Sequence, residues 1–206
     1  MPDLRAALTQ CPIVAILRGV KPDEIDAIGD ALAEAGVTVI EVPLNSPSPF
    51  ESIRRLAMRH GERALIGAGT VLEAADVARV ADAGGKLIVA PNFDADVVRA
   101  AKAARLAGLP GVMTPSEGFS ALKAGADGLK LFPAEIIPPA VFKAWRAVFA
   151  PDTLLLAVGG VGVDNIGSYA EAGASGYGIG SALYKPGRSA AEIGKLARML
   201  VAAAKT

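Results

Sequence analysis

The stretch "GADGLKLFPAE", residues 125–135, places a lysine in the middle of an apolar segment that is typical of a short β-strand. Leu129 and Leu131 flank Lys130. Because neighbouring side chains of a strand point to opposite faces, Lys130 points away from the face that the two leucines share. If the leucines pack against a layer of helices, the ammonium of Lys130 points into the space that the sheet encloses.

A glutamate shows the same alternation in "TVIEVPLN", residues 38–45. Ile40 and Val42 share one face of this predicted strand, and Val39 and Glu41 share the other. The two aliphatic residues suit a dry helix layer, so we expect Glu41 to point inward as Lys130 does. The two charged side chains then face each other across the enclosed sheet.

An inward lysine and glutamate suit one kind of chemistry. Burial lowers the pKa of an amine, because desolvation disfavours the ammonium. The neutral amine attacks carbonyl groups and forms a Schiff base, and a nearby glutamate moves the protons. The alternative is a structural ion pair, although the desolvation of two buried charges is costly. Lys102 and Lys123 also carry amines, but both are expected on solvated helices.

Eight apolar runs are typical of strands, and they alternate with longer segments of helical period along the chain. Residues 22–36 show the expected helix punctuation, with Pro22 and acids at the start and Gly36 at the end. Four predicted helices end in Ala-Gly pairs, at residues 35–36, 83–84, 107–108 and 172–173. The eight predicted strands cover residues 13–19, 38–45, 64–70, 86–92, 111–115, 128–133, 154–160 and 176–181.

Eight strand–helix units in 206 residues predict an α/β fold, a (β/α)8 TIM barrel formed by a single domain over residues 1–206. The leading segment "DLRAALTQ" predicts a short N-terminal helix that caps the bottom of the barrel. The rival is an open doubly wound sheet. Its dinucleotide fingerprint G-x-G-x-x-G is incomplete in "GAGTVLE", and such sheets usually carry fewer strands in a chain of this length.

In this fold the reactive residues lie at the C-terminal ends of the strands and in the loops that follow. Glu41 and Lys130 both fall on even-numbered strands, which fill the same interior layer of a barrel. The other side chains and glycines at these ends are Arg18, Asn45, Thr70, Pro91, Asn92, Thr114, Gly159, Gly160, Gly180 and Ser181.

Glycines after strands seven and eight predict a phosphate site. The loops there often bind phosphate through backbone N–H groups, and "VGGVGVDN" and "GYGIGSALY" supply glycines in both places. Ser181 adds a hydroxyl. The alternative is that these glycines only allow tight turns.

The composition excludes several classes of function. Lys plus Arg equals Asp plus Glu at 21 each, and aromatic residues make up 5%, which argues against a nucleic-acid partner. No segment has the length and hydropathy of a membrane span, and the start lacks a signal-peptide pattern. With one cysteine, we expect a cytoplasmic protein without an internal disulfide. The lone His60 is expected at the surface, and no metal site or cofactor is predicted.

Seven motifs in order, "IVAILRG", "EVPLNSP", "IGAGTV", "APN", "LKLFPAE", "AVGGV" and "GIGSALY", resemble the bacterial 2-keto-3-deoxy-6-phosphogluconate and 2-keto-3-deoxy-6-phosphogalactonate aldolases. These are metal-independent class I aldolases on (β/α)8 barrels, usually homotrimers. The resemblance implies that Lys130 forms the Schiff base and that Glu41 is the general acid/base. It implies that Arg18, Thr70 and Pro91 bind the pyruvate portion, that Phe132 forms a pocket wall, and that Gly159, Gly160, Gly180 and Ser181 bind phosphate. Trp145 and Phe149 fit either a subunit interface or the core.

Two positions resemble the galactonate enzymes. Gluconate enzymes have an arginine where this chain has Asn45, and a threonine where it has Val158. The resemblance therefore implies cleavage of 2-dehydro-3-deoxy-6-phospho-D-galactonate to pyruvate and D-glyceraldehyde 3-phosphate, with the C4 epimer of that substrate as the near rival. Two more distant rivals are a phosphosugar isomerase or epimerase barrel without a Schiff base, and a non-catalytic phosphate-binding barrel.

Overall fold

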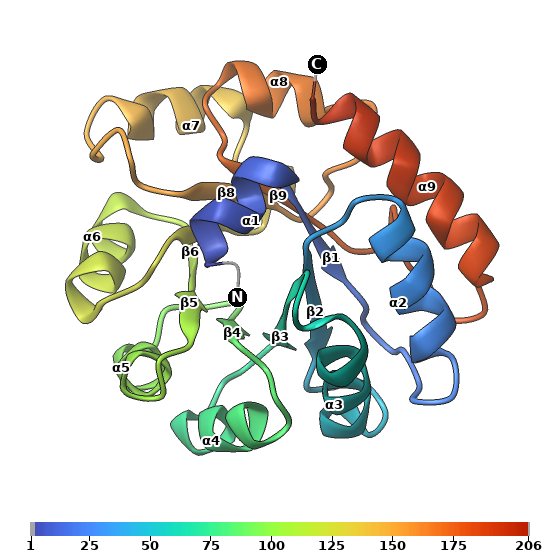
Figure 1. Ribbon diagram of the computed structural model, residues 1–206. Coiled ribbons are helices and arrows are strands. Elements are labelled where there is room, and N and C mark those ends of the chain that lie inside the picture. Colours follow the sequence, from blue (N-terminus) through green and yellow to red (C-terminus); the bar gives the residue numbers. More distant parts are fainter. Residues whose placement is uncertain (1–2, 206) are drawn as a thin grey trace.

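The computed structural model describes residues 3–205, which form a parallel barrel surrounded by helices (Figure 1). The strands lie in the order β5-β4-β3-β2-β1-β9-β8-β7-β6, and every hydrogen-bonded pair is parallel. The predicted barrel is confirmed. The strands are β1 Ile13–Ile16, β2 Val39–Pro43, β3 Leu65–Gly69, β4 Leu87–Val89, β5 Ala107–Leu109, β6 Gly111–Val112, β7 Leu129–Leu131, β8 Leu155–Val158 and β9 Gly176–Ile179.

One strand position of the barrel is occupied by two short strands. The predicted fifth strand, residues 111–115, is wrong in its bounds, because pairing begins at Ala107 and only Pro110 separates β5 from β6. Proline lacks the N–H that would continue the ladder. β5 pairs with β4 and β6 pairs with β7, so the two pieces together close the ring of eight positions.

Helices cover the outside of the barrel, and α9 packs against α2 where the ring of helices closes (Figure 1). Among residues 3–205, no helix is both long and apolar enough to span a membrane. The helices are α1 Leu4–Gln10, α2 Ile25–Glu34, α3 Pro49–His60, α4 Ala74–Asp82, α5 Ala95–Ala103, α6 Pro115–Ala124, the 3-10 helix η1 Ala134–Ile136, α7 Pro139–Arg146, α8 Ile166–Glu171 and α9 Ala190–Ala203.

Helix α5 ends earlier than predicted. Ala107-Gly108 does not terminate it; that pair belongs to β5. The residue with left-handed backbone is Arg105, with φ of 59°, and the N–H of Leu106 donates to the carbonyl of Ala101. This is the Schellman termination that glycine usually makes. Gly36, Gly84 and Gly173 make it at the other three predicted Ala-Gly ends.

Alternation along the strands separates two apolar cores, as predicted. Ile40, Val42, Leu129 and Leu131 belong to the core between the strands and the helices. The barrel interior is a second core, built from Val39 and from residues such as Leu65, Leu87, Leu109 and Leu156. The two faces of each strand are therefore buried against different partners, which fixes the register of its side chains.

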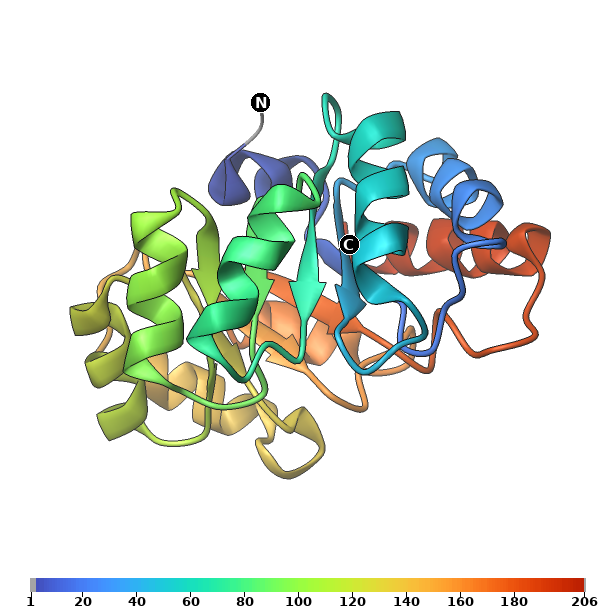
Figure 2. The same ribbon diagram turned by 90° about the horizontal axis from the view of Figure 1, so that it is seen from below.

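Helix α1 closes the bottom of the barrel, as predicted (Figure 2). Asp3 caps it by accepting a hydrogen bond from the N–H of Ala6 at 2.7 Å. Leu4 and Leu8 pack into the interior core, where burial stabilises the fold by roughly 1.5–3 kcal/mol for each side chain. The hydroxyl of Thr38, just before β2, donates to the carbonyl of Ala7 at 2.8 Å and ties the helix to the barrel.

Trp145 and Phe149 belong to the core and not to an exposed surface. They are 3% and 4% exposed, and their rings stack with centroids 5.0 Å apart. Phe149 also stacks on Phe119 of α6, at 4.3 Å. From the sequence, these two side chains fitted either a subunit interface or the core. Their burial within one chain favours the core.

Candidate active site

A cavity of about 440 Å³ opens at the C-terminal ends of β1, β7, β8 and β9. Most of the predicted site residues line it: Arg18, Lys130, Phe132, Val158, Gly159, Gly160, Gly180 and Ser181. They come from separate strands, so the barrel brings together residues that are far apart in the sequence. The end of the barrel at which the reactive residues were expected therefore contains a cavity.

Lys130 lies on β7 and points into this cavity while Leu129 and Leu131 face the helices. It is 6% exposed, and its Nζ lies 4.6 Å from the ring centroid of Phe132 on the same side of the strand. Burial lowers the pKa of Lys130, the negative charge of Glu41 opposes this, and the cation Arg18 adds to the lowering. The amine is thus easier to deprotonate than a surface lysine.

Glu41 lies on β2, is 2% exposed and is not among the residues that line the cavity. Burial raises its pKa to about 7, against the opposing effects of the positive charges of Lys130 and Arg18. Its Oε2 is buried without a hydrogen-bond partner. A carboxyl with a pKa near neutrality exchanges protons readily at physiological pH.

Glu41 and Lys130 influence each other's pKa values without a direct contact. Within residues 3–205, no ion pair of 4.0 Å or less joins them. The alternative role for these two residues was a structural ion pair, which needs such a contact to offset the cost of desolvating both charges. The two charges therefore interact electrostatically without forming such a pair.

Gly69 was not predicted as a site residue. Its lack of a side chain leaves the space that the carboxyl of Glu41 occupies. A Cβ atom at this position would lie 1.8 Å from Oε2 of Glu41 and 2.2 Å from its carboxyl carbon. The carboxylate therefore lies directly on the backbone of β3. The signal was present in "IGAGTV", where Gly69 follows the inward-facing Gly67 at a spacing of two.

Arg18, Asn45 and Thr70 form a cluster over the ends of β1, β2 and β3. Nη1 of Arg18 donates to Oδ1 of Asn45 at 2.7 Å, and Nη2 donates to Oγ1 of Thr70 at 3.2 Å. Thr70 has a left-handed backbone, with φ of 55°, which is uncommon outside glycine and recurs at functional sites. Arg18 lines the cavity, and Thr70 and Asn45 orient it from outside the lining.

Pro91 is a predicted site residue that does not line the cavity. It follows β4. A Cβ at Gly111 would lie 2.2 Å from the carbonyl oxygen of Pro91, so the two backbones are in close contact. Gly111 pairs with Lys130 across β6 and β7, and Pro91 thus supports the strands beside the lysine.

The glycines at the ends of β8 and β9 line the other side of the cavity. Gly159 and Gly160 both have positive φ, 102° and 65°, so these turns do need glycine. Gly180 has open space around its Cβ position. The turn requirement and a phosphate site, which the sequence posed as alternatives, are compatible here, because the same glycines form the turns and border the cavity.

Three further polar lining residues were not predicted from the sequence: Glu135, Tyr184 and Lys185. Glu135 closes the motif "LFPAE" and Lys185 follows "GIGSALY", so their positions beside predicted site residues were the available signal. The hydroxyl of Tyr184 donates to Oε1 of Glu24 at 2.5 Å and ties the loop after β9 to the loop after β1. Lys185 is exposed and brings a cation to the side of the cavity where the glycines lie.

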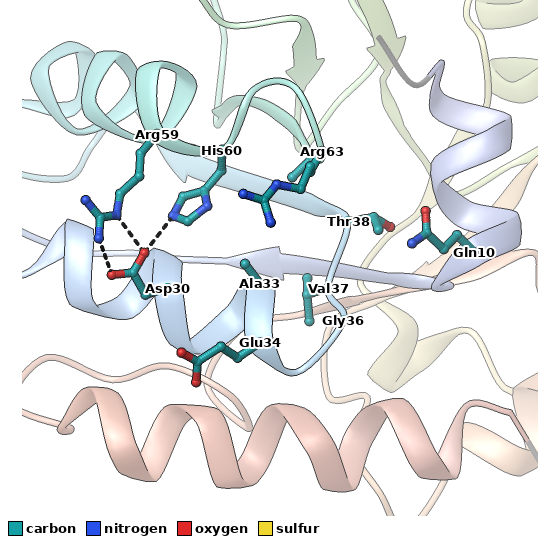
Figure 3. A pocket seen from close by; sticks show the side chains of 11 residues that line it. Gln10, Asp30, Ala33, Glu34, Gly36, Val37, Thr38, Arg59, His60 and Arg63 are labelled. Carbon is teal, nitrogen blue, oxygen red and sulfur yellow. Dashed lines mark hydrogen bonds and ion pairs between the residues drawn. The ribbon is translucent and has the colours of Figure 1, made fainter.

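A second cavity, of about 570 Å³, lies at the opposite end of the barrel (Figure 3). Asp30 of α2 accepts two hydrogen bonds of 2.6 Å from Arg59 and lies 3.3 Å from Nε2 of His60, both of which belong to α3. The prediction that His60 is a surface residue is wrong, because the α2–α3 contact buries it to 8% exposure. No predicted catalytic or substrate-binding residue lines this cavity, and its polar groups join two helices.

Comparisons with known proteins place the chain in a family. The family model described as KDPG and KHG aldolase matches residues 4–198. The chain belongs to this aldolase family. It is therefore a lyase, and the resemblance stated from the seven motifs is confirmed.

Individual relatives narrow the position within the aldolase family. A Rhizobium meliloti protein named probable 2-dehydro-3-deoxy-6-phosphogalactonate aldolase is 47% identical over 93% of this chain and 91% of its own. The 2-dehydro-3-deoxy-6-phosphogalactonate aldolase of Escherichia coli is 44% identical over 88% of each chain. A Pseudomonas aeruginosa 2-dehydro-3-deoxy-phosphogluconate aldolase is 35% identical over 77% of this chain and 70% of its own.

Solved structures agree with this order of similarity. The structure titled "Native KDPGal structure" has a TM-score of 0.93 with 42% identity and covers 94% of both chains. A Zymomonas mobilis 2-keto-3-deoxy-6-phospho-gluconate aldolase has a TM-score of 0.86 with 29% identity and covers 98% of this chain and 97% of its own.

Within residues 3–205, no group of three or more His, Cys, Asp or Glu side chains could hold a metal ion.

Proposed function

We propose that the protein reversibly cleaves 2-dehydro-3-deoxy-6-phospho-D-galactonate to pyruvate and D-glyceraldehyde 3-phosphate through a Schiff base on Lys130. The observation that carries the proposal is the buried Lys130 at the cavity, whose charge interacts with that of the buried Glu41, together with a pKa of about 7 for the Glu41 carboxyl. The two relatives at 47% and 44% identity are named for this substrate, which supports the same assignment.

The reaction begins at the C2 carbonyl of the substrate. The neutral amine of Lys130 adds to C2, and the loss of water from the carbinolamine leaves a protonated iminium. Removal of the proton from the C4 hydroxyl then breaks the C3–C4 bond, and the electron pair moves to the iminium and forms an enamine. D-glyceraldehyde 3-phosphate leaves with C4 as its aldehyde carbon. Protonation of the enamine at C3 and addition of water at C2 release pyruvate and restore the amine.

Glu41 handles the protons of these steps. Its raised pKa of about 7 lets the carboxyl both donate and accept near neutral pH. Its separation from Lys130 fits transfer through a bound water or a substrate hydroxyl. The unpartnered Oε2 supplies the acceptor for such a hydrogen bond.

The two ends of the substrate carry different charges and meet different sides of the cavity. The carboxylate of the keto acid suits Arg18, which Asn45 and Thr70 hold in place. Pro91 supports the neighbouring strands. The phosphate suits the N–H groups of Gly159, Gly160 and Gly180 and the hydroxyl of Ser181, with Lys185 as the nearby cation. Phe132 and Val158 are the apolar walls between the two ends.

Trapping of the Schiff base tests the mechanism. Borohydride added with pyruvate should reduce the iminium and leave a mass increase on the peptide that contains Lys130, with loss of activity. Lys130→Ala should not be labelled and should not turn over. A phosphosugar isomerase or epimerase, the rival class, would survive the same treatment, and unmodified Lys130 with retained activity would refute the proposal.

Assembly and location are proposed from the same resemblance. We infer a homotrimer in the cytoplasm that works without metal or organic cofactor and binds neither nucleic acid nor membranes. Light scattering after gel filtration measures the mass directly, and a monomer or dimer would contradict the assignment. Activity that persists after dialysis against EDTA is the expected result for a mechanism whose electron sink is an amine.

A further inference from the structure

The side chain of Glu135 lies on the glycine pair after β8. A Cβ at Gly159 would lie 2.6 Å from Oε2 of Glu135, and a Cβ at Gly160 would lie 2.4 Å from its Cγ and 3.2 Å from Oε1. Both glycines and Glu135 line the same cavity as Ser181. A carboxylate therefore lies against the backbone to which the proposed function assigns the phosphate.

The backbone that carries Glu135 is held in place. The hydroxyl of Tyr169, on α8, donates to the carbonyl of Ala134 at 2.8 Å, with the carbonyl of Ile137 at 3.3 Å. Tyr169 is 5% exposed, and its ring meets Phe142 of α7 edge-on at 5.4 Å. These contacts hold the backbone of η1 in place. The side chain of Glu135 therefore extends from a fixed backbone next to the glycine pair.

The carboxylate of Glu135 is not neutralised by a cation. Of the six ion pairs found among residues 3–205, none includes Glu135, and no side-chain hydrogen bond to it is present there. The cations that line the same cavity are Arg18, Lys130 and Lys185. A phosphate dianion entering at the glycine pair meets this uncompensated negative charge at short range.

We propose that Glu135 is a specificity-determining residue that weakens the binding of the phosphate group by like-charge repulsion at Gly159 and Gly160. The proposal rests on the proposed function, because it takes those glycines as the phosphate site. Its consequence is kinetic: a phosphate held less tightly lets D-glyceraldehyde 3-phosphate leave after cleavage. Lys185 acts in the opposite direction from the side of β9, so the two residues set the phosphate affinity between them.

The experiment compares three variants with the wild type. Glu135→Gln keeps the size of the side chain and removes its charge. Glu171→Gln removes the same charge from the exposed end of α8, outside the cavity, and controls for net charge. Lys185→Gln removes the cation. Isothermal titration calorimetry with inorganic phosphate gives the dissociation constant without turnover, and inhibition of substrate cleavage by phosphate gives a second value.

Phosphate should bind Glu135→Gln about fivefold more tightly than the wild type, because the repulsion between partly exposed charges at this range is about 1 kcal/mol. Glu171→Gln should match the wild type, and Lys185→Gln should bind phosphate more weakly. The rate of deuterium exchange at C3 of pyruvate, which needs no phosphate, should be the same in Glu171→Gln and the wild type.

Unchanged or weaker phosphate binding in Glu135→Gln, with weaker binding in Lys185→Gln, overturns the inference and leaves the proposed function intact. It would show that the glycine pair accommodates Glu135 and that phosphate lies elsewhere along the cavity. A dissociation constant for phosphate that is unchanged in both Glu135→Gln and Lys185→Gln also overturns the inference. Loss of the proposed function itself is recognised separately, by the absence of borohydride trapping at Lys130 in the wild type.

Discussion

Arg18 is hydrogen-bonded to an uncharged partner at the mouth of the barrel: Nη1 of Arg18 donates to Oδ1 of Asn45 at 2.7 Å. The second partner of the guanidinium, Thr70, is also uncharged. The guanidinium is therefore oriented by two hydrogen bonds while its positive charge remains available to a substrate carboxylate. The proposed binding of the substrate carboxylate therefore rests on Arg18, in a chain that has Asn45 where the resemblance implies an arginine in gluconate enzymes.

Asn45→Asp should convert that partnership into an ion pair and weaken substrate binding. The new carboxylate keeps the geometry but competes with the carboxylate of the keto acid for Arg18. We expect KM for pyruvate exchange and for the sugar acid to rise about tenfold, with kcat changed much less. Steady-state kinetics measure both. Asn92→Asp, which adds the same charge at an exposed position after β4, is the matched control; an equal rise in KM there would attribute the effect to net charge.

Gly69→Ala should inactivate the enzyme by displacing Glu41. The new methyl group would lie 1.8 Å from Oε2, so the carboxyl must move off the backbone of β3. We expect kcat to fall about 100-fold or more, in the range that removal of a general acid/base produces. Circular dichroism checks the fold, and Gly167→Ala, where a Cβ meets nothing within 4 Å, is the control. Wild-type kcat in Gly69→Ala would remove Glu41 from the mechanism.

The positions of Lys130 and Glu41 were predictable from sequence because they depend on a local rule. Strand alternation with period two assigns each side chain to a face, and Leu129 and Val42 mark the helix side. The barrel followed from the alternation of strands and helices. For Gly69 and Glu135 the sequence offered only their positions inside or beside predicted motifs, because their importance arises from contacts with residues on other strands or turns.

The predicted end of α5 and the predicted exposure of His60 were wrong because both depend on structure that a single segment of sequence does not reveal. Helix α5 was predicted to continue to Gly108 because Arg105 gives no sign that it adopts left-handed backbone, which arginine rarely does. The surface position predicted for His60 rests on its place in "MRHGER", at the end of a predicted helix. The crossing of α2 and α3 places His60 against Gly29, where a Cβ would lie 2.9 Å from Nε2, and this contact between helices is invisible in either segment alone.

Glu41→Gln should stabilise the fold at high pH while abolishing catalysis. The pKa of Glu41 is raised from 4.5 to about 7 in the folded state, so the folded chain holds a proton that the unfolded chain loses. Below pH 4.5 both states are protonated and the ionisation of Glu41 costs nothing. Stability falls as pH rises from 4.5 to 7, by about 3 kcal/mol in total, and stays reduced above pH 7.

The difference in the free energy of unfolding between Glu41→Gln and the wild type should therefore grow with pH across this window. Urea denaturation at pH 4.5, at about pH 6 and at about pH 8 measures it. Because the amide of the variant would still place a buried polar group over Gly69, the comparison isolates the ionisation of the carboxyl. A difference that is constant with pH would mean that Glu41 ionises with an ordinary pKa and is not tuned by burial.

Val158→Thr should shift the preference between the two C4 epimers toward the gluconate substrate. Val158 is 5% exposed and lines the cavity between Phe132 and the glycine pair, where a substrate lying from Lys130 to the phosphate end would present C4. Valine and threonine have nearly the same shape, so the change adds one hydroxyl that can hydrogen-bond the C4 hydroxyl of one epimer. We expect the ratio of kcat/KM values to move about tenfold. Epimer-resolved assays coupled to pyruvate detection measure this ratio. Val112→Thr, on the helix side of β6, adds the same hydroxyl away from the cavity and should leave the ratio unchanged.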